Sequence, residues 1–249
     1  MRNNYQLLIY MLLTATIAAC SDNIGSFGDD TAESRMKIEL TGDIEQVAAT
    51  RVNDNGFVGG DVMGVYIVDY NDSVPGTLKT SGNRGDNVRH TFDEANYKWN
   101  SAYDVFWKDK HTHIDVYGYY PFGNPESIDS YSFTVQQDQS KPTEGGAMGG
   151  YEASDFLWGK AEDVAPTTSV VRLSMYHRMA NARVTLVEGT GFADGEWAST
   201  EKQVAVANVV REASVNLADG TVRTNGDVEK KATMPPPRNI SSYILRRDT

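Results

Sequence analysis

Two histidines lie close enough in the sequence to suggest metal chemistry. His111 and His113 are two residues apart, so on a strand their side chains would share one face, and imidazole nitrogen is a common zinc ligand. Their neighbours Lys108, Asp109 and Lys110 supply no clear third ligand. We therefore interpret this stretch as an exposed loop edge, and we predict neither a metal nor any other cofactor.

The chain lacks the motifs of the common enzyme classes. The glycines of 189–195 miss the G-x-G-x-x-G spacing, and no G-x-S-x-G elbow, H-E-x-x-H or phosphate-binding loop is present. Carboxylates such as Asp54, Asp61 and Asp69 could meet in a fold to form a glycosidase pair. Carboxylates on an acidic surface are more often solvated charges, so we predict that the chain is not an enzyme.

The single cysteine is best explained as an attachment point. Cys20 ends an apolar stretch, 7–20, which follows Arg2 and is too short for a membrane-spanning helix. Residues 17–20, Ile-Ala-Ala-Cys, resemble the lipobox of bacterial lipoproteins, in which the cysteine becomes the lipidated first residue of the mature protein. We expect 1–19 to be a signal peptide and Cys20 to carry lipid such as palmitate. An ordinary signal peptide that contains a cysteine is the alternative.

The segment after the cysteine has no hydrophobic period. Residues 20–35 are polar and acidic, which is typical of a flexible tether. The formal net charge of the whole chain is -11, which argues against nucleic acid as a partner and favours solubility at an exposed surface.

Strand patterns dominate the chain from residue 36 onward. Met36, Ile38 and Leu40 alternate with charged residues, which indicates a half-buried strand. The apolar run 62–68 is typical of a strand covered on both faces, and the stretch 114–120, which Pro121 closes, predicts a further strand. Short alternating stretches separated by turn residues predict an all-β fold, an antiparallel β-sandwich.

The second half of the chain is harder to interpret. The valines of 206–213 fit a helical period as well as a strand, and both interpretations stay open. Asp219 and Gly220 are suited to a tight hairpin turn. A second domain over 167–249 would have only about 80 residues, below the roughly 100 of a two-sheet sandwich. Together with the prolines of 235–237 and the ending soon after an apolar pair, this suggests an incomplete domain and a truncated chain.

Several sequence pieces recur in a characteristic order after the lipobox: Thr50-Arg51, 57–66, 117–122, 135–140, 155–158 and 173–186. Together with the lipobox, these pieces resemble the fimbrillin family of Mfa-like, type V pilin-like outer-membrane lipoproteins. The resemblance covers about residues 36 to 222.

This resemblance implies two transthyretin-like β-sandwich domains, here 36–166 and 167–249, with the second short or incomplete. It also implies a lipoprotein exposed at the outer membrane or in a fimbrium, with a role in adhesion. The partners would be other pilin subunits of the same or a related kind, the membrane through the lipid, and surface ligands of host or bacterium.

The resemblance further implies an assembly step. In polymerising members an arginine-specific protease removes the N-terminal strand, and a strand from the next subunit fills the groove by β-strand addition. The matching arginine here is Arg51, whose cleavage would release the strand with Met36, Ile38 and Leu40, or Arg35, whose cleavage would leave it in place. The family's donor strand comes from the C-terminal region, so the short C-terminal half puts self-polymerisation in doubt.

A function from a different class stays open. A surface lipoprotein could bind glycans for nutrient uptake through exposed aromatic side chains, of which Trp99, Trp107 and Trp158 are the candidates. An exposed aromatic row would favour this alternative, whereas a sheet edge covered by the strand at Met36 would favour assembly.

Overall fold

The computed structural model describes residues 36–45, 56–141, 144, 147–184, 186–226, 228–229, 232–233 and 241–246. Strands form most of its regular structure, and the helical elements in these ranges are a 3-10 turn, η1 (Glu152–Ser154), and a single helical turn, α1 (Glu196–Ser199). The predicted all-β class is confirmed. No helix in the described ranges is long and apolar enough to cross a membrane.

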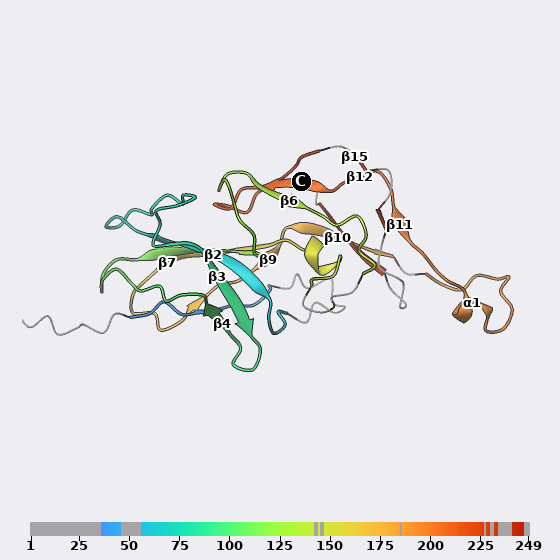
Figure 1. Ribbon diagram of the computed structural model, residues 1–249, viewed down its shortest axis with the longest axis horizontal. Helices are drawn as coiled ribbons and strands as arrows, with labels where there is room; N and C mark the ends of the chain where they lie inside the picture. Colours follow the sequence, from blue (N-terminus) through green and yellow to red (C-terminus); the bar gives the residue numbers. More distant parts are fainter. Residues whose placement is uncertain are drawn as a thin grey trace, which may run out of the picture. The chain divides into compact units, whose positions relative to one another are not determined.

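The largest sheet has eight strands in the order β8-β1-β4-β3-β2-β5-β7-β9. Its strands β2, β3, β4, β7 and β9 are labelled in Figure 1. Neighbouring strands are antiparallel except β1 and β8, which are parallel. The strands are β1 (Leu40–Thr41), β2 (Val62–Asp69), β3 (Gly85–Asp93), β4 (Lys98–Ser101), β5 (Ile114–Tyr120), β7 (Leu157–Val164), β8 (Val171–Arg172) and β9 (Tyr176–His177).

The two edge strands of this sheet belong to one stretch of chain. β8 pairs with β1 at one edge, β9 pairs with β7 at the other, and only residues 173–175 separate them. Glycines let this stretch pass close to the sheet: a Cβ at Gly118 would lie 2.3 Å from Leu173 Cδ2, and one at Gly159 would lie 2.2 Å from the Ser174 oxygen. The sheet is thereby closed on itself, which leaves fewer unpaired strand edges.

Strands β2 and β5 are covered on both faces, as the continuous apolar run predicts for β2. All seven residues of β5 and six consecutive residues of β2 are buried. Because side chains alternate along a strand, Val65 and Ile67 enter one core while Tyr66 and Val68 enter another. The first core comprises Ile38, Leu40, Phe57, Met63, Val65, Ile67, Val88, Phe92, Trp99, Val105, Trp107, Ile114, Val116, Tyr120, Leu157, Val171, Leu173 and Met175.

The second core lies between the large sheet and a three-stranded sheet. This smaller sheet has the order β14-β13-β6, formed by β6 (Tyr131–Thr134), β13 (Glu212–Val215) and β14 (Val222–Thr224). Trp158 of β7 donates from Nε1 to the carbonyl oxygen of Leu217 at 2.8 Å and so ties the two sheets together. The second core comprises Tyr66, Val68, Leu78, Tyr117, Tyr119, Ile128, Phe133, Val135, Phe156, Trp158, Met179, Ala213, Val215 and Leu217.

The predicted turn at Asp219 and Gly220 lies between β13 and β14. Gly220 has a φ of 71°, and a Cβ there would lie 2.6 Å from the ring of Trp158. Glycine therefore serves both the left-handed backbone and the close approach to the tryptophan.

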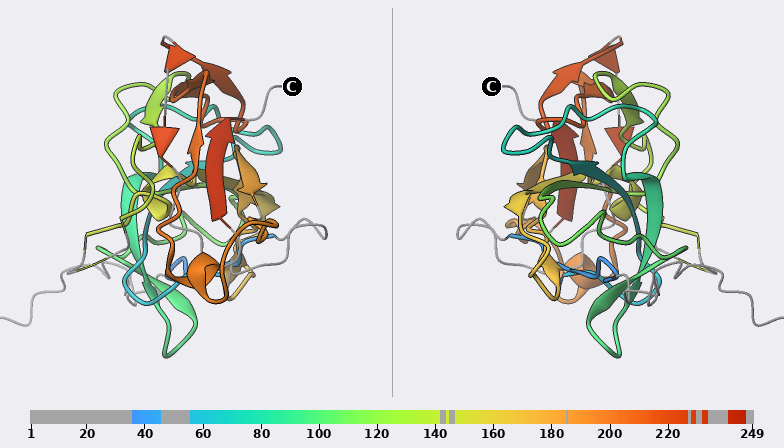
Figure 2. Two further views of the ribbon diagram at one scale, coloured as in Figure 1. Left: turned by 90° about the vertical axis from the view of Figure 1, so that its right-hand side faces the viewer. Right: turned by 90° about the vertical axis from the view of Figure 1, so that its left-hand side faces the viewer.

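Three two-stranded sheets complete the described fold. They pair β10 (Met179–Val184) with β17 (Ser241–Arg246), which lie side by side in Figure 2, β11 (Ala205–Val206) with β16 (Ala232–Thr233), and β12 (Val209–Val210) with β15 (Val228–Glu229). The stretch 206–213, for which helix and strand were both open, therefore contributes strands, which suits the β-branched valines.

The domain limits 36–166 and 167–249 stay predictions, as do the signal peptide 1–19 and the tether 20–35. Strands on both sides of residue 166 are hydrogen-bonded in the same sheets, because β8 and β9 join the large sheet and β6 pairs with β13. Residues 1–35 lie outside the described ranges.

Candidate functional site

The segment 36–45 lies between two other stretches of backbone and hydrogen-bonds to both. On one side it runs antiparallel to 98–107: Ile38 N–H donates to the Val105 oxygen at 2.8 Å, and Trp107 N–H donates to the Met36 oxygen at 3.0 Å. Leu40 is paired with Trp99 in the same direction. In Figure 1 this blue segment passes beside β4.

On its other side the segment runs parallel to 171–175. The N–H groups of Val171, Leu173 and Met175 donate to the oxygens of Glu39, Thr41 and Asp43 at 2.8, 2.8 and 2.9 Å. Glu45 N–H in turn donates to the Met175 oxygen at 2.7 Å. The segment is therefore an internal strand of the closed sheet rather than a cover laid over its edge.

The inner face of the segment is apolar and belongs to the first core. Ile38 and Leu40 are 3% and 2% exposed, and Ile44 is partly buried against the same core. Burial of such a side chain contributes about 1.5–3 kcal/mol to stability. The prediction for Met36 was wrong: its side chain is 44% exposed, because the segment meets the sheet through the Met36 carbonyl and only later through side chains.

The outer face of the segment makes polar contacts on both sides. Lys37 Nζ lies 2.5 Å from Asp104 Oδ1, and Glu45 accepts a 2.8 Å hydrogen bond from the Ser174 hydroxyl. The Tyr97 hydroxyl donates to Asp43, and this hydrogen bond raises the pKa of Tyr97. Exposed ion pairs contribute only about 0–1 kcal/mol each, so the apolar face dominates the stability of the segment.

Gly42 lies against the backbone of the parallel neighbour with no room for a side chain. A Cβ at this position would lie 2.2 Å from the carbonyl oxygen of Leu173 and 3.1 Å from its carbonyl carbon. These are backbone atoms, which cannot rotate away as the end of a side chain can. Glycine is therefore required by the local packing.

The sequence pattern revealed only part of this site. The expected alternation stopped at Leu40, whereas the structure continues the strand contacts to Glu45. Gly42 interrupts the alternation of apolar side chains because it has none. Ile44, six residues after Ile38, was the residue that could have shown that the alternation continues. The partner stretch 171–175 is far away in the sequence and had no signal that linked it to 36–45.

The remaining sites predicted for assembly cannot be placed. The lipid attachment residue Cys20 and the two candidate cleavage residues, Arg35 and Arg51, lie outside the described ranges. They stay predictions.

The aromatic row predicted for glycan binding is wrong. Trp99, Trp107 and Trp158 are 4%, 6% and 9% exposed, and all three are core residues. Trp99 packs edge-on against Phe57 with ring centroids 4.7 Å apart. None of these three rings is available to stack on a sugar.

The histidine pair does not form a cluster of metal ligands. His113 lies 2.7 Å from Asp163 through Nδ1, while His111 is exposed on the loop before β5. Within the described ranges, no three His, Cys, Asp or Glu side chains are grouped so that they could hold a metal ion.

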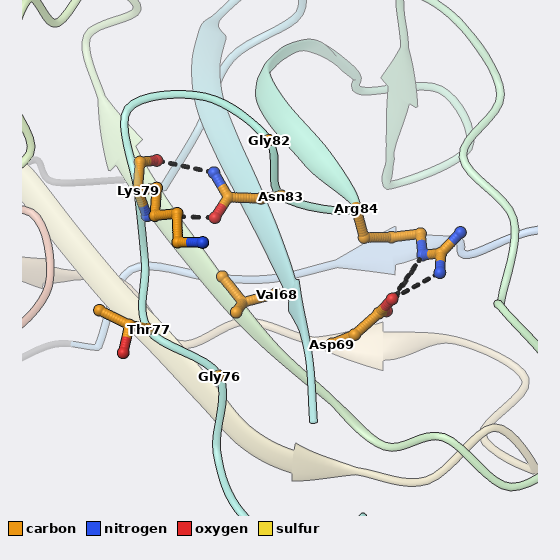
Figure 3. Close-up of a pocket in the computed structure, with 8 residues that line it drawn as sticks. All are labelled: Val68, Asp69, Gly76, Thr77, Lys79, Gly82, Asn83 and Arg84. Atoms are coloured by element: carbon orange, nitrogen blue, oxygen red, sulfur yellow. Dashed lines mark hydrogen bonds and ion pairs between the residues drawn. The ribbon is translucent and has the colours of Figure 1, made fainter. Parts of the chain in front are cut away.

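A polar pocket of about 500 Å³ lies beside the end of β2 (Figure 3). Arg84 donates from Nε and Nη2 to the Asp69 carboxylate at 2.5–3.1 Å, and this contact raises the pKa of Arg84. Asn83 bonds both the N–H and the carbonyl oxygen of Lys79 at 3.1 and 2.6 Å. These hydrogen bonds fix the conformation of the 71–84 loop. They do not pair a nucleophile with a general base among the residues that line the pocket.

The fold and the site define an all-β protein with a short N-terminal segment built into its main sheet. The family model described as "Fimbrillin-like" matches residues 50–245. The chain therefore belongs to the fimbrillin-like family, and this membership supports a role as a fimbrial subunit at the cell surface. A search of curated proteins finds no match.

Solved structures agree on the fold. A candidate cell adhesion protein from Bacteroides ovatus is similar with a TM-score of 0.62 and 17% identity, over 86% of this chain and 78% of the other. One from Bacteroides uniformis is similar with a TM-score of 0.60 and 17% identity, over 84% and 74%. At these identities the likeness shows the shared fold.

Proposed function

We propose that the chain is a surface lipoprotein that serves as a structural or accessory subunit of fimbriae, with a role in adhesion. Lipid on Cys20 anchors it in the outer membrane, and the predicted tether 20–35 separates the folded part from the lipid. Family membership supports the fimbrial part of this proposal.

We further propose that subunits join by β-strand addition in the groove that segment 36–45 now occupies. Cleavage after Arg51 separates this segment from the rest of the chain, and a strand from another subunit then replaces it. Cleavage after Arg35 would leave the segment attached, so we favour Arg51.

One observation carries this proposal. The segment is short and N-terminal, yet it supplies an internal strand and the buried side chains of Ile38 and Leu40. Its loss would expose the edges of β4 and β8 together with an apolar groove, which is the kind of surface that an extended strand repairs.

The test compares the exported protein before and after treatment with an arginine-specific protease. Intact mass measures where the chain is cut, and native gel electrophoresis measures assembly. We expect loss of the residues up to Arg51 and a ladder of higher oligomers.

Two variants are the controls. Arg51→Ala should abolish both the cut and the ladder, while Arg35→Ala should change neither. A wild-type protein that is cut at Arg51 but stays monomeric would contradict assembly by this route. An Arg51→Ala variant that still forms the wild-type ladder of oligomers would also contradict it.

A further inference from the structure

We propose that the groove selects its incoming strand by a glycine at the place of Gly42. The accepted pattern is apolar-x-apolar-x-Gly-x-apolar, with the three apolar residues at the places of Ile38, Leu40 and Ile44. This inference rests on the proposed exchange of segment 36–45.

Backbone hydrogen bonds determine which residues of a strand in the groove face inward. The N–H groups of Val171, Leu173 and Met175 point to carbonyl oxygens at every second residue of the segment. Any strand that accepts these bonds places one of its inward-facing residues at the place of Gly42, even if it is shifted by two residues. Because side chains alternate, its residues at the places of 38, 40, 42 and 44 all face inward.

The place of Gly42 is narrow because Leu173 is held from two directions. The N–H of Leu173 donates to the Thr41 oxygen at 2.8 Å. The Leu173 side chain packs against Gly118 of β5 so closely that a Cβ on Gly118 would lie 2.3 Å from Leu173 Cδ2. The carbonyl oxygen of Leu173 faces Gly42, and a Cβ added to Gly42 would lie 2.2 Å from it. Movement of Leu173 away from a larger residue would disturb the contact with β5.

This requirement excludes a strand formed by residues 227–249. No glycine occurs in 227–249, so no register of that stretch supplies one. With Tyr243 and Leu245 at the places of Ile38 and Leu40, Arg247 would occupy the place of Gly42. The incoming strand is therefore a strand of another subunit that carries the pattern, and residues 227–249 of a second copy do not supply it.

The first test uses the cleaved wild-type protein and three fluorescent synthetic peptides. They are residues 36–45, the same peptide with Gly42→Ala, and residues 239–249. We expect the 36–45 peptide to bind, and the Gly42→Ala peptide to bind at least about 50-fold more weakly, since backbone atoms cannot make room. The 239–249 peptide should bind no better than the alanine peptide. Binding of either peptide within about 3-fold of the 36–45 peptide would overturn the proposal.

The second test needs no cleavage, so it separates this inference from the proposed function. In the full chain, Gly42→Ala should speed hydrogen exchange at the amides of Leu173 and Met175 by at least about 50-fold. Gly189→Ala is the matched control, because nothing lies within 4 Å of an added Cβ there, and its exchange at these amides should stay unchanged. Unchanged exchange in Gly42→Ala would overturn the inference. If the wild-type protein is not cut at Arg51 but Gly42→Ala shows the faster exchange, the proposed cleavage is contradicted and the inference on Gly42 is not.

Discussion

At the scale of single residues, His90 is a titratable group enclosed by the fold. It lies on β3, is 2% exposed, and donates from Nδ1 to the Val88 oxygen at 3.0 Å. Burial, together with a smaller effect of the Lys37 charge on segment 36–45, lowers the pKa of His90 to about 4. The folded protein therefore holds this imidazole neutral at pH values where an exposed histidine is protonated.

We predict that the free energy of unfolding falls as the pH drops from about 6.5 to about 4. In that range the unfolded chain binds a proton at His90 and the folded protein does not, so protonation favours unfolding. The difference between the two pKa values corresponds to at most roughly 3 kcal/mol. Urea unfolding at a series of pH values measures it.

The matched variants are His90→Gln and His111→Gln. The first should flatten the pH dependence in this range, and the second should leave it as in the wild type, because His111 is exposed. Equal pH dependence in wild type and His90→Gln would contradict the prediction.

At the scale of elements, segment 36–45 combines a buried and an exposed side chain within five residues. Leu40 is 2% exposed in the first core, whereas Met36 is 44% exposed. Both residues carry large apolar side chains in the same short segment. Truncation of each one therefore distinguishes the contribution of core packing to stability from that of an apolar side chain as such.

Leu40→Ala should lower the free energy of unfolding by about 2–5 kcal/mol, because it removes buried methyl groups and leaves a cavity. Met36→Ala should change it by no more than about 0.5 kcal/mol. Denaturant unfolding of the two variants beside the wild type makes the comparison. Similar losses in both would mean that the inner face of the segment does not contribute as the structure indicates.

At the scale of the whole molecule, residues beyond 166 complete the large sheet and its core. Val171, Leu173 and Met175 are 2%, 1% and 1% exposed and belong to the first core. The same stretch bonds to segment 36–45 at one edge of the sheet and to β7 at the other. The early and late parts of the chain therefore depend on each other.

We predict that a chain shortened to residue 166 does not unfold cooperatively, because the first core would lack these three side chains and two strand edges would be unpaired. A chain shortened to residue 226 keeps both cores and should retain a single transition. Thermal unfolding followed by circular dichroism compares them. A cooperative transition in the shorter chain would support an independent domain ending at 166.

The sequence by itself determined the class of fold and many of its strands. Alternation and apolar runs are local properties, so 62–68 could be identified as a doubly covered strand, and 114–120 as a strand, from their residues alone. The turn at Asp219 and Gly220 follows from backbone preferences that are equally local.

The tertiary structure alone decided which strands become neighbours. Pairing of 36–45 with 171–175 joins residues more than a hundred positions apart, and hydrophobic periodicity carries no information on such partners. The fold likewise left Met36 exposed and Trp99 buried, which alternation along the chain does not reveal. The pairing with 171–175 also explains Gly42, because the backbone of Leu173 leaves no room for a Cβ at this position.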